Sequence, residues 1–331
     1  MWKRVQAMKI CIVGAGAIGG FLGIRLANVG HQVSLLARGK HLEAIRNNGA
    51  RLIENDGEIK INIAASYDPE DFGPQDCVFI TLKTPSLNDV LPKLTPLLNA
   101  NTTVVSAMNG IPWWFLDNLN GPLKGHTLNS IDPRHTLLDV LPIERIIGCV
   151  VHAGSVVVEP GVIHHSSGDL FIIGEPDNTI KDRTIEIRES IISSNLTCTI
   201  TDNIHREIWS KLVGNMGMGP ISALTKLTLS GIANDPDARK ISIAMMKEAM
   251  SIGEELNLNI GMTANARVDL GAELGDFKPS ILQDLEKGRP MEIDALIGVV
   301  EEIGKLVNIP TPIIDTVLAL QRAQARYVGL Y

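Results

Sequence analysis

A glycine-rich turn between an apolar run and a helix is the feature that most constrains the fold of this chain. Residues 9–13 read Lys-Ile-Cys-Ile-Val, the β-branched run expected of a strand buried on both faces of a parallel sheet. A GxGxxG turn follows, with a helix predicted over 17–28. In this setting the three glycines permit a tight turn, a close approach to a pyrophosphate, and close helix–strand packing. We predict a dinucleotide site on Gly14, Ala15, Gly16, Ala17, Ile18 and Gly19.

The alternation of strands and helices continues after this turn. The predicted elements are strands at 32–36, 77–82 and 103–107, a hairpin turn at 55–58, a helix over 86–98, and strands joined by short turns from 146 to 174. The first elements indicate a doubly wound parallel sheet. The closely spaced later strands indicate an antiparallel extension of that sheet.

Beyond about residue 200 the pattern is almost wholly helical. Apolar residues recur at helical spacing over 203–218, 235–256, 280–287, 291–307 and 312–326. Ser280 and Gln283 fit a capping box, and Pro290 suits a first helical turn. The predicted fold class is therefore α/β: an N-terminal Rossmann-like doubly wound sheet with an antiparallel extension over 1–200, followed by an all-α C-terminal domain over 201–331. We expect the two domains to pack with a cleft between them.

Charge and motif content exclude several classes of protein. The 331-residue chain has a net charge of −7, so a nucleic-acid backbone would be repelled on average. His152, His164 and His165 lack metal-site spacing, and we expect no metal. Neither G-x-S-x-G nor H-E-x-x-H is present, which removes the common hydrolase motifs.

Cysteine placement and hydropathy point to a cytoplasmic protein without a membrane partner. The cysteines are far apart, and the first three lie in apolar runs where thiols behave as small buried hydrophobes: Cys11, Cys77, Cys149 and Cys198. Lys3 and Arg4 precede an apolar stretch that resembles a signal peptide, but its glycines argue against one. No run reaches the length of a membrane span. Met8 is an alternative start.

The segment that follows the second predicted strand favours NADP (NADPH) over NAD. An NAD site usually carries an acid there, which binds the ribose 2′-hydroxyl. This chain instead has Arg38, with Lys40 two residues on. A guanidinium attracts the 2′-phosphate that a carboxylate would repel. The alternative interpretation is an exposed basic loop.

Two charged residues stand on apolar helical faces. Lys211 and Asn215 lie one turn apart in a row led by apolar residues, so the lysine either extends out of a packed interface to solvent or lines a cleft. Glu292 heads the apolar row of the 291–307 helix, where it either complements the helix dipole or faces a ligand. Residue statistics alone leave both pairs of interpretations open.

Taken in order, these segments resemble the ketopantoate reductase (2-dehydropantoate 2-reductase) family over nearly the whole chain. The matching segments are 9–20 with the glycine turn, Leu82-Lys83, Asn109-Gly110, 209–215, 280–284 and 292–294. The resemblance implies a Rossmann-like domain and a helical domain, in which NADPH reduces the 2-oxo group of ketopantoate to give D-pantoate for pantothenate biosynthesis.

The resemblance also implies roles for individual residues. Lys211 matches the proton donor, and Glu292 matches the acid near the nicotinamide end of the cofactor. Further cofactor contacts are implied for the glycine turn, Lys83, Asn109 and Gly154. Further substrate contacts are implied for Asn109, Lys211, Asn215, Ser280, Ile281, Leu282 and Gln283.

Some positions depart from the family pattern and leave alternatives open. Gly219 is found where the family commonly has a polar asparagine. Trp113 and Trp114 make the loop after Asn109-Gly110 bulkier than is typical of the family. A reductase of another branched or aromatic 2-oxo acid is therefore the first alternative, and a non-catalytic NADP-binding sensor is the second. The expected partner is a small-molecule 2-oxo acid, and the sequence leaves a homodimer open.

Overall fold

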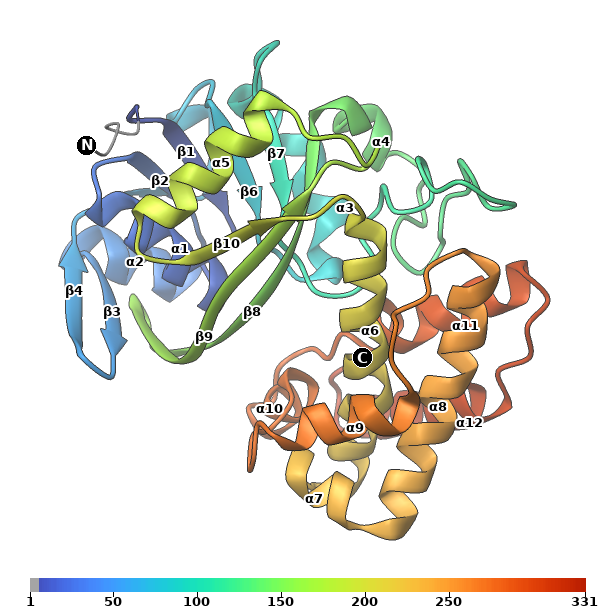
Figure 1. Cartoon of the computed structure of the whole chain (residues 1–331). Helices are drawn as coiled ribbons and strands as arrows, with labels where there is room; N and C mark the ends of the chain where they lie inside the picture. The colour runs from blue at the N-terminus through green and yellow to red at the C-terminus, as the bar shows by residue number, and fades with distance from the viewer. Residues whose placement is uncertain (1–5) are drawn as a thin grey trace. The chain divides into compact units, whose positions relative to one another are not determined.

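The computed structural model describes residues 6–331, which form two compact units (Figure 1). Unit 1 contains the described part of Met1–Met108 together with Thr136–Ile204, and unit 2 contains Asn109–His135 and His205–Tyr331. The predicted division after residue 200 placed Asn109–His135 in the first domain, whereas this segment groups with unit 2. Lys3 and Arg4 lie outside the described residues.

Unit 1 is built on one sheet, which among the described residues has ten strands. Their bounds are β1 (Lys9–Val13), β2 (Gln32–Leu36), β3 (Ala50–Glu54), β4 (Gly57–Ile61), β5 (Ala64–Ser66), β6 (Cys77–Ile80), β7 (Thr103–Ser106), β8 (Ile146–Glu159), β9 (Val162–Gly174) and β10 (Thr197–Ile200). The order is β4-β3-β9-β8-β7-β6-β1-β2-β5, with β10 beside β9. Strands β2, β1, β6, β7 and β8 are mutually parallel neighbours.

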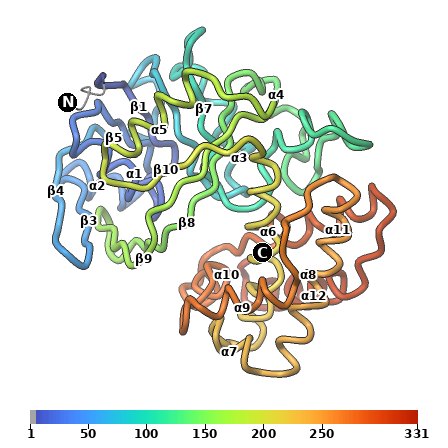
Figure 2. The backbone as a smooth tube through the Cα atoms, viewed as in Figure 1, coloured from blue at the N-terminus to red at the C-terminus, as the bar shows by residue number. Residues whose placement is uncertain are grey.

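The predicted antiparallel extension is the long hairpin of β8 and β9, whose two strands run side by side in Figure 2. The predicted hairpin turn at 55–58 is also confirmed, since it joins β3 and β4.

The helices of unit 1 are α1 (Ala17–Asn28), α2 (Gly39–Asn48), α3 (Leu87–Val90), α4 (Leu137–Val140) and α5 (Asp182–Ser193). Helices α1 and α5 contact the sheet and each other. Their contribution to the core is Phe21, Leu22, Ile24, Leu26, Ile187 and Ile191. Each such side chain stabilises the fold by roughly 1.5–3 kcal/mol when fully buried.

The helix predicted over 86–98 is wrong. Only α3 is α-helical there, and short 3₁₀ turns surround it at Thr84–Ser86, Leu91–Lys93 and Thr95–Leu97. Each 3₁₀ turn carries a proline. Proline removes an N–H donor and clashes with the preceding turn, so closely spaced prolines strongly disfavour a continuous helix here.

Unit 2 is helical. Its helices are α6 (Ile204–Thr225), α7 (Leu229–Asn234), α8 (Pro236–Glu255), α9 (Ala264–Ala272), α10 (Ser280–Glu286), a π-helical turn (Asp294–Gly298), α11 (Val299–Leu306) and α12 (Pro312–Tyr327). Helix α6 continues through Pro220, beyond its predicted end at 218. No helix within residues 6–331 is long and apolar enough to cross a membrane.

Two predicted helix starts in unit 2 are wrong. Ser280 is the first helical residue rather than the N-cap, and it makes no capping hydrogen bond. Gln283 instead donates its side-chain amide to the Lys278 carbonyl at 2.9 Å. Pro290 lies outside the first helical turn, because the helical segment begins beyond Glu292 with the π-helical turn.

Buried cysteines behave as predicted. All four are free and buried. Burial raises the pKa of Cys11 to about 12, so this thiol stays neutral at physiological pH. The thiols therefore serve as core packing groups.

Candidate functional site

The glycine turn has the geometry that its sequence predicts. Gly14 has φ +104°, and its carbonyl accepts hydrogen bonds from the Gly16 N–H and the Thr81 hydroxyl, both at 2.7 Å. A Cβ on Gly19 would overlap that same carbonyl oxygen and the Thr81 Oγ1. The third glycine is thus required for the close contact between α1 and the turn.

The amino end of α1 suits an anionic group. A Cβ on Gly16 would meet nothing within 4 Å, so the outer side of the turn is open. The first turn of α1 contains no acidic residue, and in the described part of the chain no side chain makes a capping hydrogen bond at its N-cap. The positive end of the helix dipole is therefore uncompensated, which fits the pyrophosphate of a dinucleotide.

The second strand brings Arg38 to the same edge of the sheet. The N–H groups of Gly14 and Ala15 both donate to the Leu36 carbonyl at 3.2 Å, which joins the turn to the end of β2. Arg38 is two residues further on, at the N-cap of α2, and its side chain is exposed. Lys83 is also exposed and follows β6, the other neighbour of β1.

Gly154 is placed differently from the other predicted cofactor residues. Gly148 of β8 pairs with Ser106 at the end of β7, so Gly154 lies beyond that edge in the β8–β9 hairpin. A Cβ there would lie 2.7 Å from the Ser167 hydroxyl oxygen of β9. The local requirement for glycine is therefore explained by the hairpin, and a cofactor contact stays a prediction.

In unit 2 the structure brings Lys211 and Asn109 together. The Lys211 ammonium donates a hydrogen bond to Asn109 Oδ1 at 2.8 Å. Along residues 211–220 of α6, the two that are not buried are Lys211 and Asn215, so these two form the accessible stripe of that stretch. The amide oxygen orients the ammonium, as expected of a group placed for proton transfer.

Further contacts in unit 2 involve the segments that carry the other predicted site residues. A Cβ on Gly110, which has φ +78°, would lie 2.6 Å from the Ala295 carbonyl oxygen of the π-helical turn. That turn follows Glu292, whose exposed fraction is 7%. On α10, the Ile281 side chain would lie 3.1 Å from a Cβ on Gly219. The Asn109-Gly110 turn therefore contacts both α6 and the π-helical turn, and α10 packs against α6 at Gly219.

The tryptophan loop has a structural role. Trp114 is fully buried, Trp113 is 5% exposed, and the Trp114 ring meets the His205 ring edge-on at 5.5 Å. Burial lowers the pKa of His205 to about 4, despite an opposing hydrogen bond to the Phe115 backbone. The bulk that the sequence suggested for an aromatic substrate is used in the core of unit 2.

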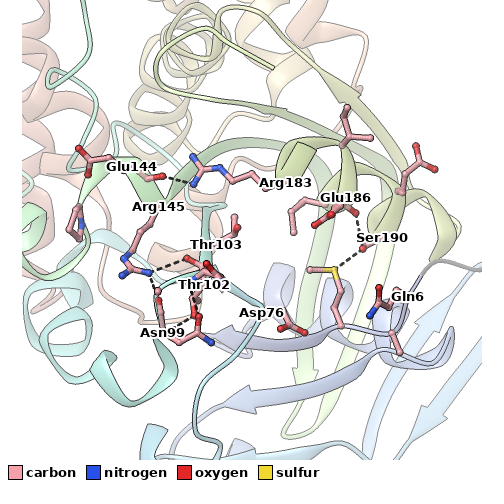
Figure 3. Close-up of a pocket in the computed structure, with 18 residues that line it drawn as sticks. Gln6, Asp76, Asn99, Thr102, Thr103, Glu144, Arg145, Arg183, Glu186 and Ser190 are labelled. Atoms are coloured by element: carbon pink, nitrogen blue, oxygen red, sulfur yellow. Dashed lines mark hydrogen bonds between the residues drawn. The ribbon is translucent and has the colours of Figure 1, made fainter. Parts of the chain in front are cut away.

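A polar groove opens at the other edge of the sheet in unit 1 (Figure 3). Met8, Asp76 and Thr103 line it at the amino ends of β1, β6 and β7. Its Arg183 already pairs with the buried Glu175. Ligands of doubly wound sheets bind beyond the carboxyl ends of the strands, so this groove is not part of the candidate site.

The sequence analysis did not identify two residues that lie beside the predicted site residues. Thr81 is the hydroxyl that holds the Gly14 carbonyl, and its place at the end of a predicted strand was the available clue. Arg267 lies against α6 beside the Lys211 row, and the clue was a glycine, Gly214, next to Asn215. In the described part of the chain, no three His, Cys, Asp or Glu side chains are close enough to hold a metal ion.

A sheet with a dinucleotide-type glycine turn, together with a helical unit that presents an oriented lysine, defines a nucleotide-dependent oxidoreductase. Two family models match: "Ketopantoate reductase PanE/ApbA" over residues 10–113 and "Ketopantoate reductase PanE/ApbA C terminal" over residues 203–325. The chain belongs to the ketopantoate reductase family, which comprises NAD(P)-dependent reductases.

Relatives match along the whole chain. The 2-dehydropantoate 2-reductase of Mesorhizobium japonicum is 44% identical over 98% of this chain and 100% of its own length. A solved structure from Ralstonia solanacearum is 41% identical, covers 98% of this chain and 100% of its own, and has a TM-score of 0.94. A structure of D-mandelate dehydrogenase with NADH, 21% identical with a TM-score of 0.84 over 98% of this chain and 100% of its own, shares the fold.

Proposed function

We propose that this protein reduces 2-dehydropantoate (ketopantoate) to D-pantoate with NADPH, a reaction of pantothenate biosynthesis. The observation that carries the proposal is the hydrogen bond between Lys211 and Asn109, which orients an ammonium on a stretch of α6 where only Lys211 and Asn215 are not buried. The 44% identity to a 2-dehydropantoate 2-reductase over the full chain supports the substrate.

Each predicted site residue of unit 2 has a role in this proposal. The Lys211 ammonium gives a proton to the substrate oxygen as it becomes an alkoxide, and its charge stabilises that oxygen. Asn109 orients the ammonium, and Asn215 and the Ser280–Gln283 segment contact the substrate. Glu292 is the acid near the nicotinamide end in this proposal, and its burial supports a role for its charge there. NADPH, when bound, supplies the hydride.

Unit 1 holds the cofactor in this proposal. The N–H groups at the start of α1 receive the pyrophosphate, and the exposed Arg38 and Lys83 contact the phosphate-bearing parts. The fold alone does not set the cofactor, since D-mandelate dehydrogenase shares it and binds NADH. The preference for NADPH therefore depends on Arg38.

A panel of 2-oxo acids tests the substrate. We expect kcat/KM with NADPH to be at least about tenfold higher for ketopantoate than for an aromatic 2-oxo acid such as phenylglyoxylate. The reason is that Trp113 and Trp114 are occupied in core packing. Faster turnover of the aromatic acid would favour the first alternative, and no NADPH oxidation with any acid would favour the sensor.

Changing Arg38 to aspartate tests the cofactor. The wild type should prefer NADPH to NADH, and Arg38→Asp should lower kcat/KM for NADPH by roughly ten- to a hundredfold, since attraction to the 2′-phosphate becomes repulsion. NADH kinetics should change much less. Arg38→Gln separates the loss of attraction from repulsion and should fall between the two. Equal efficiencies with both cofactors in the wild type would contradict the assignment.

A further inference from the structure

One arginine of unit 2 is packed against α6, the helix of Lys211, without a counter-charge among residues 6–331. Arg267 lies on α9, and a Cβ added to Gly214 of α6 would overlap its Cζ and Nη2 and lie 2.8 Å from its Nε. The guanidinium therefore lies directly over the glycine. Any larger residue at 214 would push it away, so the glycine makes the room that the guanidinium occupies.

Arg267 has no anionic partner among residues 6–331. Its Nε is buried without a hydrogen-bond acceptor, and no carboxylate lies within ion-pair distance. By contrast, Arg239 of α8 forms a 2.8 Å ion pair with Asp269, which lies on α9 with Arg267. Burial lowers the pKa of Arg267. A half-buried charge without a partner is costly, and an anion bound beside it would remove that cost.

The position of Arg267 relates it to the proposed site. Gly214 is three residues after Lys211, so the two lie on neighbouring parts of one helical face. On the other flank of the row, Ile281 of α10 packs against Gly219. The accessible stripe of Lys211 and Asn215 is therefore bounded by the guanidinium of Arg267 on one side and by α10 on the other.

We propose that Arg267 binds the carboxylate of the 2-oxo acid whose oxo group faces Lys211; this inference rests on the proposed function. Lys211 and Gly214 are separated by about 4.5 Å along the helix axis, since an α-helix rises about 1.5 Å per residue. The carboxylate and the oxo group of a 2-oxo acid are on adjacent carbons, so one small molecule can reach both cations. The planar guanidinium offers a carboxylate two parallel hydrogen bonds.

Binding of pantoate and of its neutral lactone to the NADP⁺-loaded protein tests the inference by calorimetry. Arg267→Met keeps the packing stem and removes the charge. We expect the wild type to bind pantoate more tightly than the lactone, and Arg267→Met to weaken pantoate binding roughly ten- to a hundredfold while lactone binding stays the same. In turnover the change should appear mainly in KM for ketopantoate.

The matched control is Arg239→Gln, which removes an ion-paired arginine beside the same helix and should leave pantoate binding unchanged. Should Arg267→Met fail to fold, Gly214→Ala displaces the guanidinium without removing it and should weaken pantoate in the same way. Wild-type affinity for pantoate in a folded variant overturns the inference, as does absence of pantoate binding by the wild type. The proposed function is judged separately, by wild-type turnover of ketopantoate.

Discussion

Replacing Lys211 with alanine should lower kcat for ketopantoate by about a hundredfold or more, since general acid catalysis typically contributes 10²–10⁴. The Lys211 ammonium is the group that Asn109 orients at 2.8 Å. Without it, the developing alkoxide has neither a proton donor nor a nearby positive charge. Steady-state kinetics measure the loss, and NADPH fluorescence titration together with thermal unfolding should show cofactor binding and fold intact.

The controls separate this role from a surface role. If Lys211 only extends to solvent, its removal should change the free energy of unfolding by at most about 0.5 kcal/mol and leave turnover unchanged. Lys240→Ala removes an exposed lysine of α8 and should match the wild type in both respects. Glu292→Gln should alter the pH profile of kcat more than the stability. Normal turnover in folded Lys211→Ala protein would reject the mechanism.

Local sequence was enough for the first βαβ unit. The predicted elements at 9–13, 17–28 and 32–36 agree with β1, α1 and β2. Continuous apolar runs and a glycine turn act within a few residues, so the chain alone determines these elements. Proline has an equally local effect, and weighing the three prolines between 84 and 97 would have corrected the helix predicted there.

Membership of the two units could not be predicted, because it depends on contacts between distant residues. The segment Asn109–His135 is held in unit 2 partly by Glu302 of α11, whose carboxylate accepts hydrogen bonds from the backbone N–H groups of Asn129 at 2.7 Å and Ser130 at 2.9 Å. Nothing in the local pattern around 109–135 identifies that carboxylate as its partner.

The same distinction holds for the candidate site. Helical spacing placed Lys211 and Asn215 on one face, and the structure makes them the accessible positions of that stretch. The hydrogen bond from Lys211 to Asn109 joins residues 102 positions apart, and only the resemblance to a family connected them beforehand. Arg267 had no such indication, because its relation to α6 depends on the space above Gly214.

Alanine at Gly19 should lower both stability and NADPH binding, whereas alanine at Gly16 should lower NADPH binding alone. At Gly19 the new Cβ would overlap the Gly14 carbonyl oxygen and the Thr81 hydroxyl, and would lie 2.9 Å from Ile12 Cγ2. Displacing the backbone of the turn costs free energy, so we expect Gly19→Ala to lower the free energy of unfolding by about 1–3 kcal/mol. It should also weaken NADPH, because α1 is forced away from the turn.

At Gly16 the new Cβ would meet no described protein atom within 4 Å, and the φ of −73° is outside the left-handed region that requires glycine. Gly16→Ala should therefore leave denaturant unfolding within about 0.5 kcal/mol of the wild type. It should nevertheless weaken NADPH by at least about tenfold, because the methyl group occupies the space through which the backbone would approach the pyrophosphate. If Gly16→Ala bound NADPH as the wild type does, the open side of the turn would not be the cofactor site. Because one glycine contacts only protein and the other faces only open space, the pair separates the turn's role in folding from its role in binding.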